Sequence, residues 1–460
     1  MKTVKMKKKL CSLLAAIAVL LMILPGCRKS EDVKGSAVKP EKAMDDYGKL
    51  AVVHLYKDTV YTLASIFTRE SGQQLIIDEG TLIKITPGDA GGAININPGG
   101  TIIANGTPAA PIVFTSNAAE GTQADNWGGI TIKGRGINNS RGPGGDDDDL
   151  SGTLRYTRIE FGALTLDAVG KRSIIENIMV SYCNSQGQQV ASSAFNIYGG
   201  SFNCRNLVSY ACGGPADFYI TSGYRGYMQN LLAYRHPFFG ATGINPFNTL
   251  AGVFIENNAS NPVNARPYTY PYISNMTVIG PEGQKGSPAA YSDSTLLNAA
   301  LVTTGSTCFR IRNSILLGFL NAAWQMGDSL TGTTILAGNS EFSHSLVYCA
   351  DSNRAFTLKP GVFPPFGNRN FKEYMLRPEF KNTLFGSLLD FLLADPFNYY
   401  SPDPSPAAAS SLLKGADFTG SVYSNPYFVP GTYVGAIGTT NWMKGWTNFT
   451  PLKTNYNFSR

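Results

Sequence analysis

The chain has 460 residues, of which 43% are hydrophobic and only 15% are charged, so disorder is excluded as its main state. Its 49 glycines and 26 prolines follow no collagen-like period and favour a turn-rich, mostly β chain. The formal net charge of +6 arises mainly from lysines in the first nine residues, and beyond them basic and acidic residues nearly balance. The composition therefore excludes the basic surface that is expected of a protein that binds nucleic acid.

The first 26 residues have the pattern of an export signal. Lysines precede an apolar run from Leu10 to Leu24, which is as long as the hydrophobic region of a signal peptide and short for a membrane span. The run ends in Leu24-Pro25-Gly26-Cys27, which resembles the lipobox of bacterial lipoproteins, where the cysteine is acylated after cleavage. We expect the mature protein to begin at Cys27 and to be anchored by acyl chains such as palmitate. The alternative is an ordinary signal peptide that happens to be followed by a cysteine.

A polar segment follows, and we expect residues 27–48 to be a lipidated, flexible tether because this composition cannot bury a core. Its first residues, Arg28-Lys29-Ser30-Glu31-Asp32, resemble the short acidic signal that sends lipoproteins of Bacteroidota to the outer face of the outer membrane. The expected location is therefore the outer membrane, with the protein exposed at the cell surface.

Residues 49–350 consist of short β-branched runs separated by Gly, Asn and Pro, which are strand and turn signals. An asparagine followed by an apolar run recurs at Asn177, Asn206, Asn230, Asn275 and Asn313, at spacings of 29, 24, 45 and 38 residues. One coil of roughly 20–30 residues, lengthened by loops, explains this repeat. The sequence predicts an all-β fold, a right-handed parallel β-helix in which the asparagines stack at one turn.

Two regions depart from the repeat. Residues 125–150 are glycine-rich and end in four aspartates, which indicates an inserted loop. Residues 351–460 begin with a phenylalanine-rich stretch, and we expect a C-terminal cap over the open end of the solenoid, followed by terminal coils.

The amino-acid sequence resembles that of a family of β-helix lipoproteins of Bacteroidota, most of which are uncharacterised. The resemblance spans about residues 60–450, and it implies a fold and a cell-surface address more firmly than an activity. The matching text includes Gly99-Gly100-Thr101-Ile102-Ile103, Trp127-Gly128-Gly129-Ile130, Gly223-Tyr224-Arg225-Gly226 and Tyr433-Val434-Gly435-Ala436.

Members of this family carry a stacked acidic set in the central coils, and here only Asp217 and Glu256 keep a carboxylate. Calcium needs six to eight oxygen ligands, so this departure argues against a metal-dependent role for that face. If the protein were a polysaccharide lyase or a glycoside hydrolase, Asp217 and Glu256 would be its carboxylates, with Arg225 or Arg235 as the charged partner. Either activity requires these groups to converge in one cleft.

Two further sets of residues are candidates for binding. The aspartate run of Asp146, Asp147, Asp148 and Asp149 can supply several oxygens for calcium, although most charge runs are simply solvated. Tyr268, Tyr270 and Tyr272 alternate, so on a strand they would share one face and form an aromatic platform for sugar rings. The alternative is that these tyrosines cover neighbouring coils.

Five cysteines remain besides Cys11 in the signal and Cys27. No C-x-x-C motif occurs, so zinc and redox sites are not favoured. Cys183 and Cys204 are 21 residues apart, about one coil, and we expect them either to stack as small buried groups or to form a disulfide.

We therefore expect a surface-exposed outer-membrane lipoprotein whose β-helix displays loops that bind a glycan or a neighbouring envelope protein, such as an outer-membrane transporter, without catalysing a reaction. No cofactor is expected beyond calcium at the aspartate run. The alternatives are an extracellular polysaccharide lyase or glycoside hydrolase, and a structural subunit of a larger membrane assembly.

Overall fold

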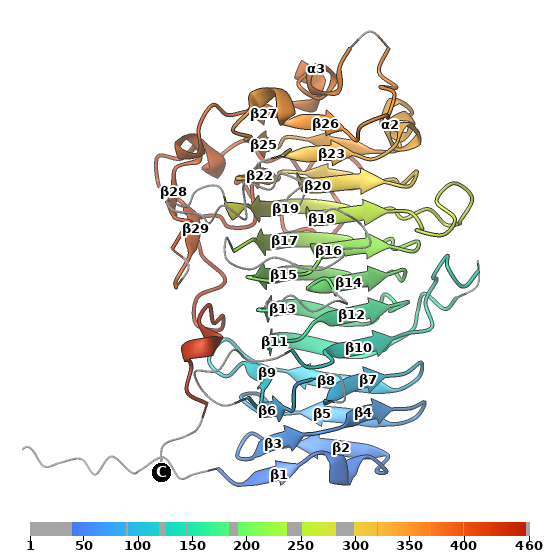
Figure 1. Cartoon of the computed structure of the whole chain (residues 1–460), viewed down its shortest axis with the longest axis vertical. Helices are drawn as coiled ribbons and strands as arrows, with labels where there is room; N and C mark the ends of the chain where they lie inside the picture. The colour runs from blue at the N-terminus through green and yellow to red at the C-terminus, as the bar shows by residue number, and fades with distance from the viewer. Residues whose placement is uncertain are drawn as a thin grey trace, which may run out of the picture. The chain divides into compact units, whose positions relative to one another are not determined.

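The fold is described from a computed structural model of the whole chain. The residues whose structure is described are 39–88, 91–118, 126–142, 145–183, 192–236, 251–281, 299–319, 321–367, 369–398 and 400–456. Two large sheets of stacked parallel strands dominate the compact unit from Pro40 to Asn455 (Figure 1). This arrangement confirms the predicted all-β parallel β-helix.

The larger sheet has 17 strands. They are β1 (Glu41–Ala43), β2 (Val52–Leu55), β3 (Val60–Leu63), β5 (Gln74–Ile77), β6 (Leu82–Ile85), β8 (Thr101–Asn105), β9 (Ile112–Ser116), β11 (Gly152–Glu160), β13 (Ile174–Ser181), β15 (Asn203–Tyr210), β17 (Tyr227–Tyr234), β19 (Tyr272–Ile279), β21 (Arg310–Arg312), β22 (Ile315–Leu317), β24 (Glu341–Ser343), β25 (Leu346–Val347) and β27 (Thr383–Leu384).

The smaller sheet has ten strands and lies opposite the larger one in each coil. They are β4 (Ile66–Arg69), β7 (Ala93–Ile96), β10 (Ile130–Lys133), β12 (Leu164–Asp167), β14 (Phe195–Tyr198), β16 (Ala216–Thr221), β18 (Ala251–Glu256), β20 (Ala299–Thr304), β23 (Trp324–Met326) and β26 (Phe356–Leu358).

The described helices are short. They are α2 (Ser329–Leu336), α3 (Phe371–Met375) and the 3₁₀ turns η1 (Asp45–Tyr47), η4 (Ser352–Arg354), η5 (Pro378–Phe380), η6 (Leu388–Phe391), η7 (Ser411–Leu413) and η8 (Pro451–Lys453). In the described ranges, none of the helices has both the length and the apolar character needed to cross a bilayer.

The larger sheet bends along one line, where each coil from β11 to β25 places a residue in the left-handed backbone conformation. The five predicted asparagines occupy this line with φ of 56–58°, and the ladder pairings of β13, β15, β17 and β19 skip them. Asparagine tolerates this conformation better than most residues because its short amide side chain can bond locally. The side chains also bond to one another, since Asn230 Nδ2 donates to Asn206 Oδ1 at 2.9 Å. The predicted asparagine ladder is confirmed.

The core consists of inward-facing apolar side chains that stack from coil to coil. In the smaller sheet, one continuous column of buried, register-matched side chains runs through seven strands. Its members are Leu164, Phe195, Phe218, Val253, Leu301, Trp324 and Phe356. The rings of Phe195 and Phe218 stack with centroids 4.8 Å apart. Such a column gives each coil an apolar partner above and below, which is how a solenoid buries its core.

The stack begins within the segment expected to be a tether. Strand β1 pairs with β3, and the side chain of Met44 is fully buried at the end of the core. The carboxylate of Asp45 accepts hydrogen bonds from the backbone N–H groups of Ala64 and Ser65, at 3.0 and 2.9 Å. The ordered coils therefore start near residue 41 rather than 49, because a short polar segment satisfies backbone donors at the end of the stack.

The inserted loop lies against the turns of several coils. Gly136 N donates to Ala168 O at 2.7 Å, and Gly200 N donates to Ile137 O at 2.6 Å. Asn139 reaches further and donates from Nδ2 to Asn257 Oδ1 at 3.0 Å. The loop thus links coils that are well separated along the stack.

The far end of the stack is closed by aromatic side chains. Trp324 packs edge-on against Phe371 of α3, with centroids 4.9 Å apart, and Phe366 stacks on Phe371. The expected terminal coils are not found in the described part of this region, where β27 is the last parallel strand and β28 (Leu393–Asp395) pairs antiparallel with β29 (Asp403–Pro406).

The chain then runs back along the outer face of the larger sheet, and we call residues 416–450 the C-terminal strap. Figure 1 shows this orange-to-red segment beside the coils. Asp417 N donates to Asn313 Oδ1 at 2.8 Å, Asn275 Nδ2 donates to Tyr433 O at 2.9 Å, and Asn448 Nδ2 donates to Glu160 Oε1 at 3.3 Å. The strap is therefore bonded to coils along much of the stack, two of its partners being ladder asparagines.

Candidate functional site

Asp217 lies inside the protein rather than in a cleft. Its side chain has no exposed area, and Oδ2 accepts a hydrogen bond from Arg235 Nε at 2.9 Å while Oδ1 accepts one from Ser209 Oγ at 2.6 Å. Burial raises the pKa of the Asp217 carboxyl, and Arg235 and Ser209 oppose that shift. The other N–H groups of Arg235 donate to the backbone carbonyls of Cys212, Gly214 and Ala251. Both charged groups are thus fully engaged within the fold.

Glu256 is the second predicted carboxylate, and it also is buried, with 7% of its surface exposed. The hydroxyl of Tyr219 on the adjacent coil donates to its carboxylate. Burial raises the pKa of Glu256, partly offset by this hydrogen bond. The ladder between β16 and β18 places Asp217 opposite Gly252, four residues before Glu256. At about 3.3 Å per residue, the two carboxylates are separated by roughly 13 Å along the strand direction.

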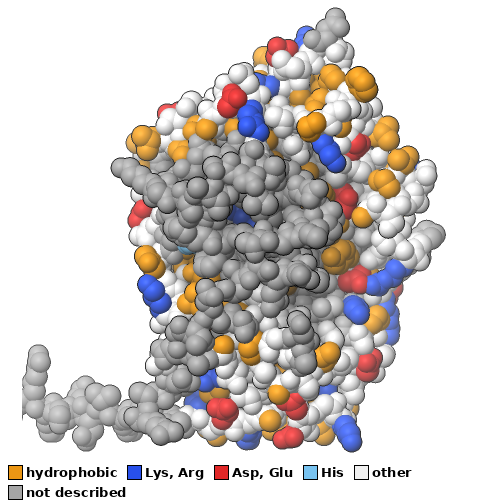
Figure 2. Space-filling view, in the orientation of Figure 1, with side chains coloured by type: hydrophobic (Ala, Val, Ile, Leu, Met, Phe, Trp, Pro, Cys, Tyr) orange, Lys and Arg blue, Asp and Glu red, His pale blue; other side chains and the backbone are white. Residues whose placement is uncertain are grey.

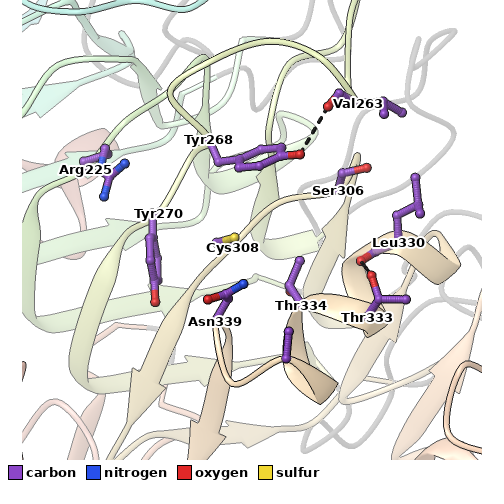
Figure 3. A pocket seen from close by; sticks show the side chains of 11 residues that line it. Arg225, Val263, Tyr268, Tyr270, Ser306, Cys308, Leu330, Thr333, Thr334 and Asn339 are labelled. Atoms are coloured by element: carbon purple, nitrogen blue, oxygen red, sulfur yellow. Dashed lines mark hydrogen bonds between the residues drawn. The ribbon is translucent and has the colours of Figure 1, made fainter.

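Arg225 does not join these carboxylates. It is exposed at the turn between β16 and β17, and it lines a pocket with a volume of about 430 Å³ (Figure 3). Asp217, Glu256 and Arg225 therefore do not converge in one cleft, which is the arrangement that a lyase or hydrolase using these residues would require, because the two carboxylates bond to neighbours within the coils.

The Arg225 pocket instead contains two of the three predicted tyrosines, Tyr268 and Tyr270, which precede β19. Figure 3 shows Tyr268 above Cys308 and Tyr270 to the left of Cys308, with Arg225 above Tyr270. The guanidinium carbon of Arg225 lies 5.6 Å from the centre of the Tyr270 ring. The other lining residues are Val263, Ser306, Leu330, Thr333, Thr334, Ala337 and Asn339. Arginine and two aromatic rings therefore share one concave site.

The three tyrosines do not form the single platform that their alternation suggested. Only Tyr272 belongs to a strand, where it is the first residue of β19, and its ring stacks on that of Tyr270 with centroids 4.9 Å apart. The ring of Tyr268 is covered on one side by the guanidinium of Arg266 at 3.7 Å, and its hydroxyl donates to Val263 O. Each of the two pocket tyrosines has one face packed against protein, and both contribute to the pocket wall.

The surroundings of the pocket are positively charged. Arg225, Arg266 and Arg310 all lie near Cys308, where they favour its thiolate, although burial is the larger effect and raises the pKa of the thiol. Arg310 also donates from Nε to the Tyr270 hydroxyl at 3.0 Å. The nearby carboxylate of Glu341 is shared between Arg310 and Arg312. Among the described residues that line the pocket there is no acidic side chain, so the pocket is suited to an anion.

The aspartate run does not gather its carboxylates around one point. Asp148 pairs with Lys171 at 2.8 Å on the surface, whereas Asp149 is buried and accepts a hydrogen bond from Ser151 Oγ at 2.7 Å. Asp146 Oδ1 accepts from the backbone N–H of Asp148. In the part of the chain that the structure describes, no group of three or more His, Cys, Asp or Glu side chains is arranged to hold a metal ion. The geometry gives calcium binding at Asp146, Asp147, Asp148 and Asp149 no support.

Cys27, with the signal and most of the tether, lies outside the described residues. Five cysteines of the described residues are buried and form no disulfide: Cys183, Cys204, Cys212, Cys308 and Cys349. Cys183 and Cys204 are therefore buried thiols, and no disulfide joins them in the structure. On the face shown in Figure 2, the charged side chains of the described residues are scattered rather than gathered into a basic stripe.

Sequence reasoning missed the wall of the pocket formed by α2 and the turn after it. Asp328 caps α2 by accepting a hydrogen bond from Thr331 N at 2.8 Å, which positions Thr333 and Thr334 at the pocket. An aspartate directly before Ser329–Leu336 was the available signal for the start of this helix, because aspartate is a favoured N-cap residue. The position of Cys308 and Asn339 beside Arg225 has no local signal, because these residues belong to three different coils.

Comparison with known proteins gives two matches. The family model described as pectate-lyase like beta helix domain matches residues 48–347. The crystal structure of pectate lyase Pel9A matches with a TM-score of 0.34 and 10% sequence identity, over 86% of this chain and 90% of that chain. No curated protein matches the chain. The structural likeness is too weak to carry an argument.

Proposed function

Because this chain belongs to the family of pectate-lyase like beta helix domains, we propose that it binds a polysaccharide whose sugars carry carboxylate groups. The binding site is the pocket of Arg225, Tyr268 and Tyr270. The observation that carries the proposal is the position of an exposed arginine beside two tyrosine rings in a pocket of about 430 Å³. None of the described residues that line this pocket is acidic.

The chemistry of the pocket fits a sugar acid. A guanidinium group binds a carboxylate through two parallel hydrogen bonds, which gives both affinity and orientation. Tyrosine rings offer rigid, largely apolar surfaces for the ring of a sugar, and the hydroxyls of Ser306, Thr333 and Thr334 and the amide of Asn339 supply polar groups. The size of the pocket lies in the usual range of small-ligand sites.

Binding without cleavage is supported better than hydrolysis. A glycoside hydrolase needs two carboxyl groups roughly 5–10 Å apart across the scissile bond. Asp217 is held by Arg235, Glu256 is held by Tyr219, and neither lines the pocket.

A polysaccharide lyase is the second candidate, and family membership favours it. A lyase removes a proton next to the uronate carboxylate, and Arg225 is the only charged side chain among the described residues that line the pocket. An enzyme of this kind would release unsaturated uronates from pectate, which absorb ultraviolet light. We expect no such product.

The test of the proposal is calorimetric titration with pectate, compared with the same polymer after methyl esterification of its carboxylates. We expect binding of pectate only, and a loss of affinity of roughly tenfold or more in Arg225→Ala. Arg172→Ala is the matched control, because it removes the same charge from an exposed turn elsewhere. Equal binding of the esterified polymer, or an equal effect of both variants, would refute the proposal.

We also propose that the protein is anchored at the cell surface through Cys27, as a lipoprotein of the Bacteroidota type. The supporting pattern is the lipobox-like Leu24-Pro25-Gly26-Cys27 after an apolar run. From the outer membrane, the protein would act as an accessory binding subunit, for example of an outer-membrane transporter. Cys27→Ser should abolish labelling by a palmitate analogue and release the protein from the membrane fraction. Retention of label in this variant would contradict the anchor.

A further inference from the structure

A row of stacked tyrosines continues from the pocket along the outer face of the larger sheet. Tyr270 stacks on Tyr272, with ring centroids 4.9 Å apart, and Tyr272 lies 5.1 Å from Tyr227. Tyr227 in turn stacks on Tyr427 of the C-terminal strap, with centroids 6.3 Å apart and an angle of 26° between the rings. All four side chains are only half-buried. We call these four residues the tyrosine row.

The direction of the row follows from the strand register. Tyr227 and Tyr272 are paired residues of β17 and β19, so they occupy the same position in two successive coils. Their neighbours Met228 and Ile273 point into the core, and the tyrosines therefore point outward. Because adjacent strands are about 4.8 Å apart, the row advances along the axis of the solenoid by one strand spacing per coil.

Tyr427 is fixed at its place by the sheet below it. The guanidinium of Arg205 lies 4.4 Å from the centre of the Tyr427 ring, and Arg205 Nη2 donates to the Tyr427 carbonyl at 3.3 Å. Two residues further on, Val429 is bonded to Gln229 through both of its backbone polar groups. The contact with Arg205 and the hydrogen bonds of Val429 fix the position of Tyr427 before a ligand binds, so little entropy is lost when a ligand contacts this residue.

We propose that the bound glycan extends from the pocket along the tyrosine row, so that Tyr427 of the C-terminal strap contacts the ligand. This inference rests on the proposed function, since it takes the pocket as the first subsite. It makes the ligand an oligomer of several sugars whose chain follows the stack of coils, and it makes the strap part of the binding surface.

The charges beside the row agree with a ligand that carries carboxylates along its length. Arg225 and Arg310 lie at the Tyr270 end, and Arg205 lies at the Tyr427 end. Arg205 is partly engaged with Glu176 at 3.2 Å. The half-buried rings of the tyrosine row present apolar edges, which suit the apolar parts of a sugar chain, whereas the Tyr427 hydroxyl itself is buried.

The test is the dependence of affinity on ligand length, measured by calorimetry with pectate dimers, tetramers and hexamers. For the unchanged protein we expect the affinity to rise with length. Tyr427→Ala should lower the affinity for the hexamer by roughly three- to tenfold and leave that for the dimer unchanged. Tyr427→Phe keeps the ring and should retain most of the gain. Tyr56→Ala, at the other end of the stack, is the matched control.

The outcomes separate the two proposals. If the dimer binds in an Arg225-dependent manner but longer oligomers bind no more tightly, the extended site is refuted and the pocket stands. If Tyr427→Ala weakens dimer and hexamer binding equally, the residue acts on the pocket rather than on a remote subsite, and the inference also fails. If no oligomer of any length binds, the proposed function fails, and the extended site fails with it. Thermal unfolding of each variant verifies that the strap stays folded.

Discussion

Gln229 and Val429, which are 200 residues apart in the sequence, exchange two hydrogen bonds: Gln229 Nε2 donates to Val429 O at 2.8 Å, and Val429 N donates to Gln229 Oε1 at 2.9 Å. A side-chain amide thus replaces the backbone partner that a neighbouring strand would offer. Gln229 is almost completely buried, so its amide depends on the strap for these bonds.

We predict that Gln229→Ala destabilises the protein by about 1–3 kcal/mol, because two hydrogen bonds are lost and the strap is released locally. The free energy of unfolding in urea measures the effect. Gln325→Ala, which removes a half-buried glutamine from β23 away from the strap, should cost less than about 0.5 kcal/mol. Equal effects of the two substitutions would mean that the strap contributes nothing to stability.

The ion pair of Asp217 and Arg235 is predicted to be structural. Asp217→Ala leaves the Arg235 guanidinium buried without its carboxylate and should cost about 3–5 kcal/mol. Asp217→Asn keeps one acceptor oxygen for Arg235 and places an amide N–H group that can donate to the Ser209 hydroxyl, so it should cost less. The midpoint of thermal unfolding reports both losses, whereas the affinity of the folded variants for pectate should stay the same. A variant that folds normally and yet loses binding would place Asp217 in the functional site.

The asparagine ladder allows a test of backbone strain. Asn206 has a φ of 57° and accepts a hydrogen bond from Asn230. Asn206→Ala should cost about 2 kcal/mol, from the left-handed conformation and the lost hydrogen bond together. Asn206→Gly removes only the hydrogen bond and should recover about half of this loss. Urea unfolding distinguishes the two; identical costs would show that the backbone conformation contributes no strain.

Glu256 should make stability depend on pH. Because burial raises its pKa in the folded protein, the folded state holds the proton to higher pH than the unfolded chain does. Its contribution to stability is therefore present below the ordinary pKa of glutamate, about 4.5, and is lost as the pH rises through the raised pKa. Glu256→Gln should remove this loss, so that the variant gains stability relative to the unchanged protein as the pH rises from the ordinary pKa of glutamate through the raised pKa of Glu256.

Urea unfolding at several pH values measures this difference, with Glu70→Gln on the exposed surface as the control. A stability difference between Glu256→Gln and the unchanged protein that is constant across this range would show that the carboxyl titrates alike in both states.

The coil repeat could be predicted from the sequence because each repeat contains a recognisable local residue pattern. A left-handed residue is needed at each bend, and asparagine meets that need at Asn177, Asn206, Asn230, Asn275 and Asn313, so the turn can be read from composition and spacing. The strands of the β-helix could be predicted from short β-branched runs, and its turns from the glycines between these runs.

The pocket and the strap have no such local residue pattern in the sequence. Arg225, Tyr268 and Cys308 stand in turns of different coils, and the loops between them vary in length, so their proximity depends on the full coil register. The strap is held by amide side chains that bond to its backbone groups, as Asn275 bonds to Tyr433 O. Because every residue has the same backbone groups, the sequence does not indicate which residues of the strap are bonded. The burial of Asp217 and Glu256 could not be predicted for a related reason, since only the folded stack brings Arg235, which follows β17, to Asp217, and Tyr219 of β16 to Glu256.

The most direct measurement is a crystal structure of the protein with a bound pectate trimer. We predict a uronate carboxylate within hydrogen-bonding distance of the Arg225 guanidinium, about 2.7–3.2 Å, and a sugar ring against Tyr268 or Tyr270. A trimer seated elsewhere on the solenoid, with the Arg225 pocket empty, would contradict it.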